Sequence, residues 1–175
     1  MQGNDLVVRL LDKIPKDSIG RYDLFPVFQD KELFHEIIMV LALPYIEKVD
    51  FVAAPEAIGW IMGSAVAKEL NVGFIPLRKK DKLPYPKEAL VSRNYIDYSG
   101  KEKAFEIKKE FVTAGNRILI VDEWVETGAS LHCSMSLLKQ LGCIIIGLAT
   151  IGIDYCEGTK EWIDSGFIKF IGMNI

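Results

Sequence analysis

Short apolar runs rich in β-branched residues alternate with amphipathic stretches along the chain. Such runs are typical of strands in a parallel sheet, because both faces of these strands are covered. We expect strands at 50–54, 73–77, 118–121, 143–150 and 167–171. Apolar residues at helical spacing predict helices at 30–48, 60–70, 131–141 and 161–163. This alternation predicts an α/β fold with an open, mostly parallel, doubly wound sheet.

Four features give a less certain secondary structure. Residues 6–11 fit a short helix or a strand, and the residues that follow fit a loop, either alone or with a short strand near 19–24. The helix at 30–48 contains Pro44, which should kink or split it because proline lacks the backbone N–H. Residues 105–112 fit either a strand or a short helix.

Residues 78–104 differ in composition from the rest of the chain. Basic side chains outnumber acidic ones there, and Pro84, Pro86 and Gly100 interrupt regular structure. One interpretation is a solvated loop or hairpin. The other is a lid over an anionic ligand, because long loops in compact domains often bind ligands.

Length and composition predict one soluble globular domain spanning residues 1–175, of which 50% are hydrophobic. The net charge of −3 gives no indication of a nucleic-acid or membrane partner. The apolar run 37–46 is too short to span a bilayer. The three cysteines lack metal-binding spacing and are expected to be reduced thiols. With no secretory signal pattern at the N-terminus, we expect a cytoplasmic protein.

The segment after the strand at 118–121 carries the most specific chemistry. Asp122 and Glu123 are expected at the strand end, followed by a short loop with Thr127, Gly128 and Ser130 and then a helix. A helix N-terminus with nearby hydroxyl groups suits a phosphate. Ionised carboxylates accept hydrogen bonds from the hydroxyl groups of a diol. An acidic pair alone also occurs in ordinary solvated loops, so the whole string carries the prediction.

That string, VDEWVETGAS, resembles the 5-phosphoribosyl 1-pyrophosphate (PRPP) motif of the type I phosphoribosyltransferase family. From about Tyr22 to Ser130 the chain is similar to the adenine phosphoribosyltransferases within that family. Residues 51–84 resemble their pyrophosphate loop, the following helix and an Arg-Lys strand end, and residues 95–98 resemble their hood loop. The resemblance implies the type I fold with a lid or hood at about 78–104.

The implied activity is transfer of ribose 5-phosphate from PRPP to a purine base, with adenine expected, in purine salvage. Pyrophosphate is the leaving group, and the ribose ring becomes cationic in the transition state. The resemblance also implies Mg²⁺ bound with PRPP, few protein ligands to that metal, and a homodimer.

The resemblance further assigns residues to tasks. Catalysis involves Asp97 in proton transfer and Asp122 and Glu123 in stabilising positive charge on the ribose. The ribose and 5-phosphate are bound by Asp122, Glu123, Glu126, Thr127, Gly128, Ala129 and Ser130. The pyrophosphate and lid residues are Pro55, Glu56, Ala57, Arg78, Lys79 and Tyr98. The base pocket includes Tyr22 and Asp23.

Several positions depart from the family pattern. Glu123 stands where Asp is usual, Trp124 and Glu126 where small or aliphatic residues are usual, and Ile58 and Tyr22 where Arg is expected. An aliphatic side chain cannot make a charge-assisted hydrogen bond, which is worth roughly 1.5–3 kcal/mol. A second hypothesis is therefore a PRPP- or nucleotide-binding regulatory protein, without turnover or with altered specificity. We also expect Trp124 to be exposed, at a dimer interface.

Overall fold

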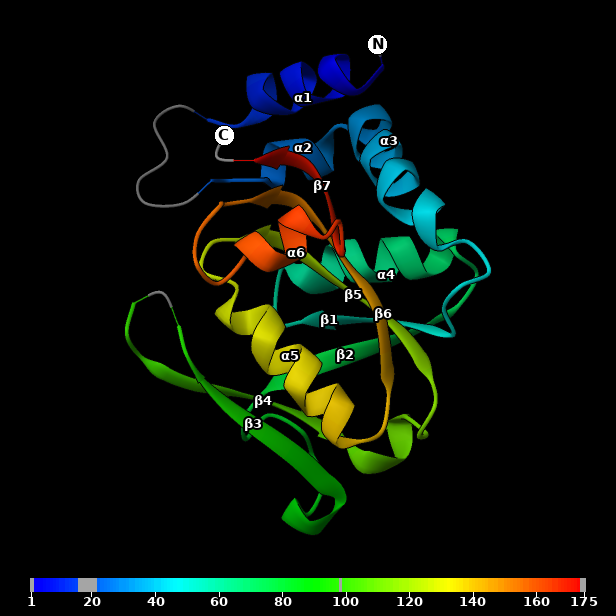
Figure 1. The fold of residues 1–175 in the computed structure, drawn as a ribbon, viewed down its shortest axis with the longest axis vertical. Helices are drawn as coiled ribbons and strands as arrows, with labels where there is room; N and C mark the ends of the chain where they lie inside the picture. Colours follow the sequence, from blue (N-terminus) through cyan, green and yellow to red (C-terminus); the bar gives the residue numbers. More distant parts are fainter. Residues whose placement is uncertain (1, 16–21, 98, 174–175) are drawn as a thin grey trace.

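A computed structural model describes residues 2–15, 22–97 and 99–173 (Figure 1). Seven strands form one sheet in the order β3-β4-β2-β1-β5-β6-β7. Their bounds are β1 Phe51–Pro55, β2 Gly73–Lys79, β3 Leu90–Ile96, β4 Glu102–Lys108, β5 Arg117–Val125, β6 Ile144–Ile153 and β7 Ile168–Met173. The strands β2, β1, β5, β6 and β7 pair in parallel, whereas β4 pairs antiparallel with both β2 and β3. The predicted open, mostly parallel α/β sheet is confirmed.

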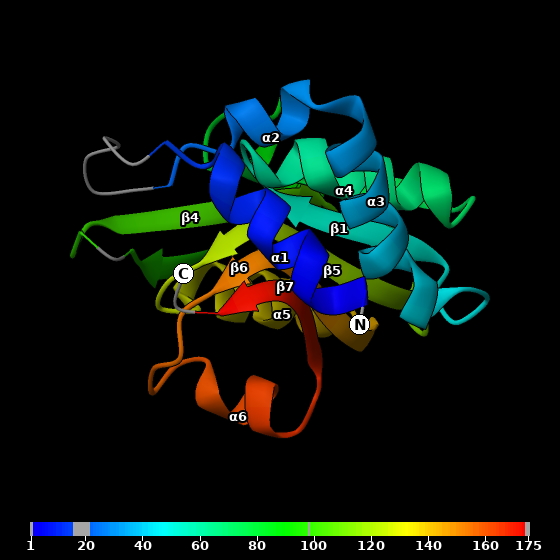
Figure 2. The same cartoon turned by 90° about the horizontal axis from the view of Figure 1, so that it is seen from above.

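Helices cover both faces of the sheet, and Figure 2 shows α4 on the opposite side from α5 and α6. The α-helices are α1 Gln2–Lys13, α2 Phe25–Gln29, α3 Lys31–Ala42, α4 Gly59–Glu69, α5 Ala129–Gln140 and α6 Lys160–Asp164. Short 3₁₀ helices are η1 Leu43–Tyr45, η2 Lys87–Ala89 and η3 Lys109–Phe111. Within the described part of the chain, no helix has the length and apolar character needed to cross a membrane.

The central strand β5 separates two hydrophobic cores. Leu119 and Val121 belong to the core beneath α1, α3 and α4, whereas Ile118 and Ile120 belong to the core beneath α5. Neighbouring residues on a strand point to opposite faces, so a continuous apolar run fills both cores. The ends of this strand are thereby held firmly in place.

The N-terminal elements resolve several open predictions. Residues 6–11 belong to helix α1. The Asp30 carboxylate accepts a hydrogen bond from the N–H of Leu33 at 3.1 Å and caps α3. This helix ends at Ala42, and Pro44 lies in η1, so the predicted split at Pro44 is confirmed. Of the strand expected near 19–24, residues 16–21 lie outside the described residues, and residues 22–24 form no strand.

The predicted end of one strand is wrong, and the segment 78–104 has a defined structure. Strand β5 continues to Val125, because its ladder with β6 extends to the pair Val125 and Ile153, so both acidic residues lie within the strand. Residues 78–104 contain most of an antiparallel hairpin, β3–β4, rather than a long loop (Figure 1). Residues 105–112 complete β4 and form η3. The segment is thus a hairpin, and its role as a lid over a ligand stays a prediction.

Candidate active site

One cleft at the carboxyl ends of β1 and β5 collects most of the predicted site residues. Those that line it are Tyr22, Asp23, Pro55, Glu56, Lys79, Asp97, Asp122, Glu123, Glu126, Thr127, Gly128, Ala129 and Ser130. Ligands of open parallel sheets bind at this end of the strands. Segments far apart in the chain therefore meet where the fold is expected to bind a ligand.

Asp122 lies at the floor of the cleft and is only 6% exposed. One carboxylate oxygen accepts a hydrogen bond from the Ser130 hydroxyl at 3.3 Å, and the other accepts the N–H of Glu123 at 3.0 Å. Burial and the neighbouring carboxylate of Glu123 raise the pKa of Asp122 well above its ordinary value. Such a site favours a ligand that brings hydrogen-bond donors or positive charge to the carboxylate.

The loop from Glu126 to Gly128 connects β5 to α5 and is the phosphate loop predicted from the sequence. Gly128 has a φ of +79°, a left-handed conformation that glycine adopts without strain. The Thr127 hydroxyl accepts a weak hydrogen bond from the Ala129 N–H at 3.4 Å. The first N–H groups of a helix lack intrahelical partners and carry partial positive charge. The start of α5 is thus suited to an anion.

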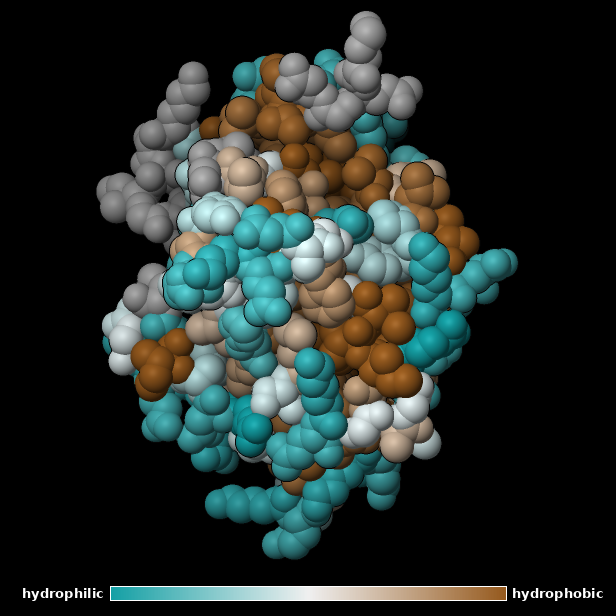
Figure 3. Space-filling model, viewed as in Figure 1, coloured by the Kyte–Doolittle hydropathy of each residue, from teal (hydrophilic) through white to brown (hydrophobic). Residues whose placement is uncertain are grey.

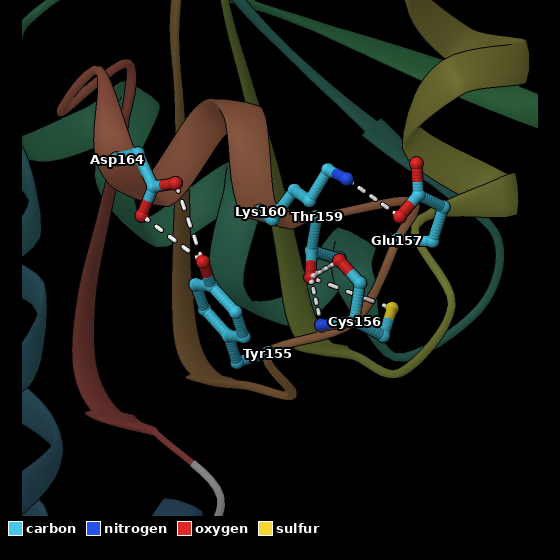
Figure 4. A network of polar contacts seen from close by, with 6 residues as sticks. All are labelled: Tyr155, Cys156, Glu157, Thr159, Lys160 and Asp164. Atoms are coloured by element: carbon cyan, nitrogen blue, oxygen red, sulfur yellow. Dashed lines mark hydrogen bonds and ion pairs between the residues drawn. The ribbon is translucent and has the colours of Figure 1, made fainter.

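A second loop, after β6, supports this phosphate loop from behind and was missed in the sequence. Thr159 is fully buried, and its hydroxyl donates a hydrogen bond to the carbonyl of Asp154. The same hydroxyl accepts a hydrogen bond from the Cys156 N–H at 3.0 Å (Figure 4). The Gly158 carbonyl lies 3.0 Å from Nε2 of His132 on α5. The spacing of apolar residues does not predict this contact between the two loops, because the contact depends on backbone groups that are distant in the sequence.

The aromatic end of the cleft contains Tyr22 and Trp124, whose ring centroids are 4.2 Å apart. Trp124 is partly buried against the core, so the prediction that it is an exposed residue is wrong. The Asp23 carboxylate accepts the N–H of Phe25 at 2.9 Å. A planar ligand ring is well suited to this end of the cleft, because it can pack against the aromatic side chains there.

At the opposite end, Glu56, Ile58 and Lys79 line the cleft, but Arg78 and Ala57 do not. The Arg78 guanidinium lies 5.1 Å from the centre of the Trp60 ring and 3.5 Å from the Glu56 carboxylate. Adjacent strand residues point to opposite faces, so Arg78 and Lys79 cannot both face the cleft. Ala57 is an exposed loop residue, and Tyr98 lies outside the described residues.

Comparison with known proteins identifies the family. Residues 29–169 match the phosphoribosyl transferase domain. The chain belongs to the phosphoribosyltransferase family. An adenine phosphoribosyltransferase of Neisseria meningitidis serogroup C is 38% identical over 146 residues, which cover 82% of this chain and 75% of that protein.

Solved structures agree with this phosphoribosyltransferase fold. A crystal structure of adenine phosphoribosyltransferase from Thermoanaerobacter pseudethanolicus has a TM-score of 0.83 and 31% identity, covering 95% of this chain and 99% of that chain. The Saccharomyces cerevisiae enzyme, complexed with an imino-altritol bisphosphate and adenine, has a TM-score of 0.78 and 26% identity. The match covers 90% of this chain and 94% of that chain. The predictions of the family and of a glycosyltransferase enzyme are confirmed.

In this phosphoribosyltransferase, Asp97 is held by the β3–β4 hairpin. Its carboxylate accepts the N–H groups of Ser99 at 2.9 Å and Lys101 at 3.0 Å, and it forms an ion pair with Lys103. The bond to Lys103 and those from Ser99 hold the pKa of Asp97 well below its ordinary value. A carboxylate with a low pKa is a weak base, so this geometry favours a structural role over the predicted proton transfer.

Replacing Asp97 with asparagine should lower the melting temperature at pH 7. A lowered pKa in the folded state contributes stability above the ordinary value of 3.8, and this contribution disappears as the pH falls through the folded pKa. The difference between Asp97→Asn and wild type should therefore shrink as the pH falls below about 4. Circular dichroism during thermal unfolding, at several pH values, measures this difference in melting temperature. A constant difference would contradict this account.

Proposed function

We propose that this enzyme transfers ribose 5-phosphate from PRPP to adenine and releases pyrophosphate, as a cytoplasmic enzyme of purine salvage. The observation that carries the proposal is the cleft in which Asp122 lies beside the phosphate loop, with Ser130 bonded to its carboxylate. The curated relatives named above, which are adenine phosphoribosyltransferases, support adenine as the base. The aromatic end of the cleft is consistent with a purine ring.

We assign the proposed roles from the cleft geometry. The start of α5, from Thr127 to Ser130, binds the 5-phosphate through N–H groups and hydroxyls. Asp122 and Glu123 accept hydrogen bonds from the ribose hydroxyls and favour the positive charge that develops on the ring. Tyr22 and Asp23 contact the base. Glu126 lines the same wall of the cleft, beside the phosphate loop.

The reaction exchanges one bond at the anomeric carbon for another. The bond from that carbon to the pyrophosphate oxygen breaks, and its electron pair leaves with pyrophosphate. A ring nitrogen of adenine donates its lone pair to the same carbon and then loses its proton to solvent. The carboxylates of Asp122 and Glu123 act mainly by electrostatic stabilisation, because the ring carries positive charge between these two events.

We also propose that Mg²⁺ binds together with PRPP. Among residues 2–15, 22–97 and 99–173, no group of three or more His, Cys, Asp or Glu side chains is placed to hold a metal ion. Mg²⁺ commonly takes one or two carboxylates and completes its shell with substrate oxygens and water. Asp122 and Glu123 fit that pattern. When bound, the metal would neutralise charge on the pyrophosphate group.

A homodimer is part of the same proposal. Figure 3 shows hydrophobic residues gathered over α3 and along the first half of β6. Val40 is 45% exposed, Leu43 66% and Ile144 52%. Covering such side chains with a second copy of the chain would remove apolar surface from water.

The test is a coupled assay of pyrophosphate release with PRPP and Mg²⁺. We expect release only when adenine is present, and much less release with guanine, hypoxanthine or uracil. Omission of Mg²⁺ should abolish most of the activity. Tight PRPP binding in a calorimeter without release for any base would favour the regulatory hypothesis, in which the protein binds PRPP without turnover.

A further inference from the structure

The positive charges that line the cleft are few. Of the described residues along its walls, only Lys79 and Lys103 carry a positive charge. Ile58, where the family resemblance places an arginine, is aliphatic and also lines the cleft. A departing pyrophosphate gains negative charge and is stabilised by donors that carry positive charge. With an aliphatic residue at position 58, these two lysines are the described cleft residues that can supply such a charge.

Lys103 is placed to supply that charge. It lies on β4, which pairs antiparallel with β2 so that Lys79 is opposite Phe105. Lys103 is therefore the diagonal neighbour of Lys79, and residues in that relation are about 7–8 Å apart, within reach of long side chains. Both lysines also border a second hollow, whose other lining residues are Lys80, Asn94, Glu102 and Ala104. The two lysine side chains thus line the cleft and the hollow beside it.

The orientation of Lys103 is set by its ion pair with Asp97. The Asp97 side chain is only 6% exposed, whereas the Lys103 side chain is 40% exposed. Asp97 is itself fixed by the N–H groups of Ser99 and Lys101 in the hairpin turn. An ammonium group has three donors, so the ion pair leaves donors for a ligand. The pair therefore holds a cation at the cleft wall without occupying all of its donors.

We propose that Lys103 binds the pyrophosphate group of PRPP, in place of the arginine missing at Ile58, and that Asp97 is its positioning residue. This inference rests on the proposed phosphoribosyl transfer. Lys103 contacts the pyrophosphate in the bound substrate and stabilises the charge that this group gains when its bond to the ribose breaks. The contact acts on PRPP and on pyrophosphate but not on the base.

The test is Lys103→Met, with Lys103→Arg and Lys101→Met as matched variants. We expect Lys103→Met to raise the KM for PRPP and the inhibition constant of pyrophosphate about 10-fold or more, from the usual strength of hydrogen bonds to charged groups. The KM for adenine should not change. Lys103→Arg should retain most of the affinity, and Lys101→Met, on an exposed side chain of the same hairpin, should behave as wild type. Asp97→Asn should raise the KM for PRPP and leave the KM for adenine unchanged.

A second substitution separates a binding role from a folding role. In the Lys103→Met background, Ile58→Arg should recover much of the lost affinity for pyrophosphate, because it restores a cation on the facing loop. An unchanged inhibition constant in folded Lys103→Met, or in Lys103→Gln if the first variant does not fold, would overturn the inference. If wild type shows no turnover, the proposed function fails. Calorimetric titration of these variants with pyrophosphate then decides the role of Lys103 by itself.

Discussion

Asp122→Asn should slow phosphoribosyl transfer strongly and at the same time stabilise the folded protein at neutral pH. The carboxylate is buried beside Glu123, which lowers the stability of the folded protein when no ligand is bound. The same carboxylate stabilises the transition state, in which the ribose is positively charged. Asparagine has nearly the same shape but no charge. We expect kcat/KM to fall roughly 10²–10³-fold, the usual effect of removing one electrostatic contact to a transition state.

The gain in stability has a defined dependence on pH. The pKa of Asp122 is raised in the folded state above its ordinary value of 3.8, so its stability contribution is fully present below that value and is lost as the pH rises. Asp122→Asn removes this loss, so its advantage in melting temperature should grow as the pH rises from about 4. For a chain of this length, each kcal/mol corresponds to about 2–4 °C.

Thermal unfolding and steady-state kinetics measure the two effects on the same samples. Asp12→Asn, on an exposed position of α1, is the control and should change neither. An Asp122→Asn variant that is both less stable and fully active would show that the carboxylate is structural.

Gly158→Ala should raise the KM for PRPP strongly without a matching change in the KM for adenine. A Cβ atom at position 158 would lie 2.2 Å from the Thr127 carbonyl oxygen, so the phosphate loop or the loop after β6 must move. Both partners are backbone, which leaves no flexible side chain to relieve the contact. Forced displacements of this kind cost roughly 1–3 kcal/mol, or about a 5- to 150-fold rise in KM.

Steady-state kinetics with each substrate varied in turn separates the two KM values. Glu157→Ala is the control in the same loop, because the Glu157 side chain is exposed and forms its ion pair with Lys160, within the segment after β6 (Figure 4). Equal rises in both KM values for Gly158→Ala would indicate general unfolding of the site. An unchanged KM for PRPP would show that the loop after β6 does not position the phosphate loop.

The sequence by itself determined the central features of this protein. The apolar run at 118–121 predicted the central strand, because residues covered on both faces must all be apolar. The string from Asp122 to Ser130 predicted a carboxylate pair next to a helix N-terminus, and these residues line one cleft in the structure. Such signals can be recognised in the sequence because they depend on neighbours within a few positions.

Only the tertiary structure decided which side chains meet. The hydrophobic periodicity of the segment 78–104 is weak. Its hairpin joins the sheet because β4 pairs with β2, a strand that precedes it in the chain. The same pairing turns Lys79 toward the cleft and brings Lys103 to it, whereas Arg78 packs on Trp60. The close approach of Gly158 to Thr127 and the tilted ring contact between Trp124 and Tyr22 are likewise contacts between distant segments. Local patterns do not contain these contacts, because they arise only when strands pair and loops pack in three dimensions.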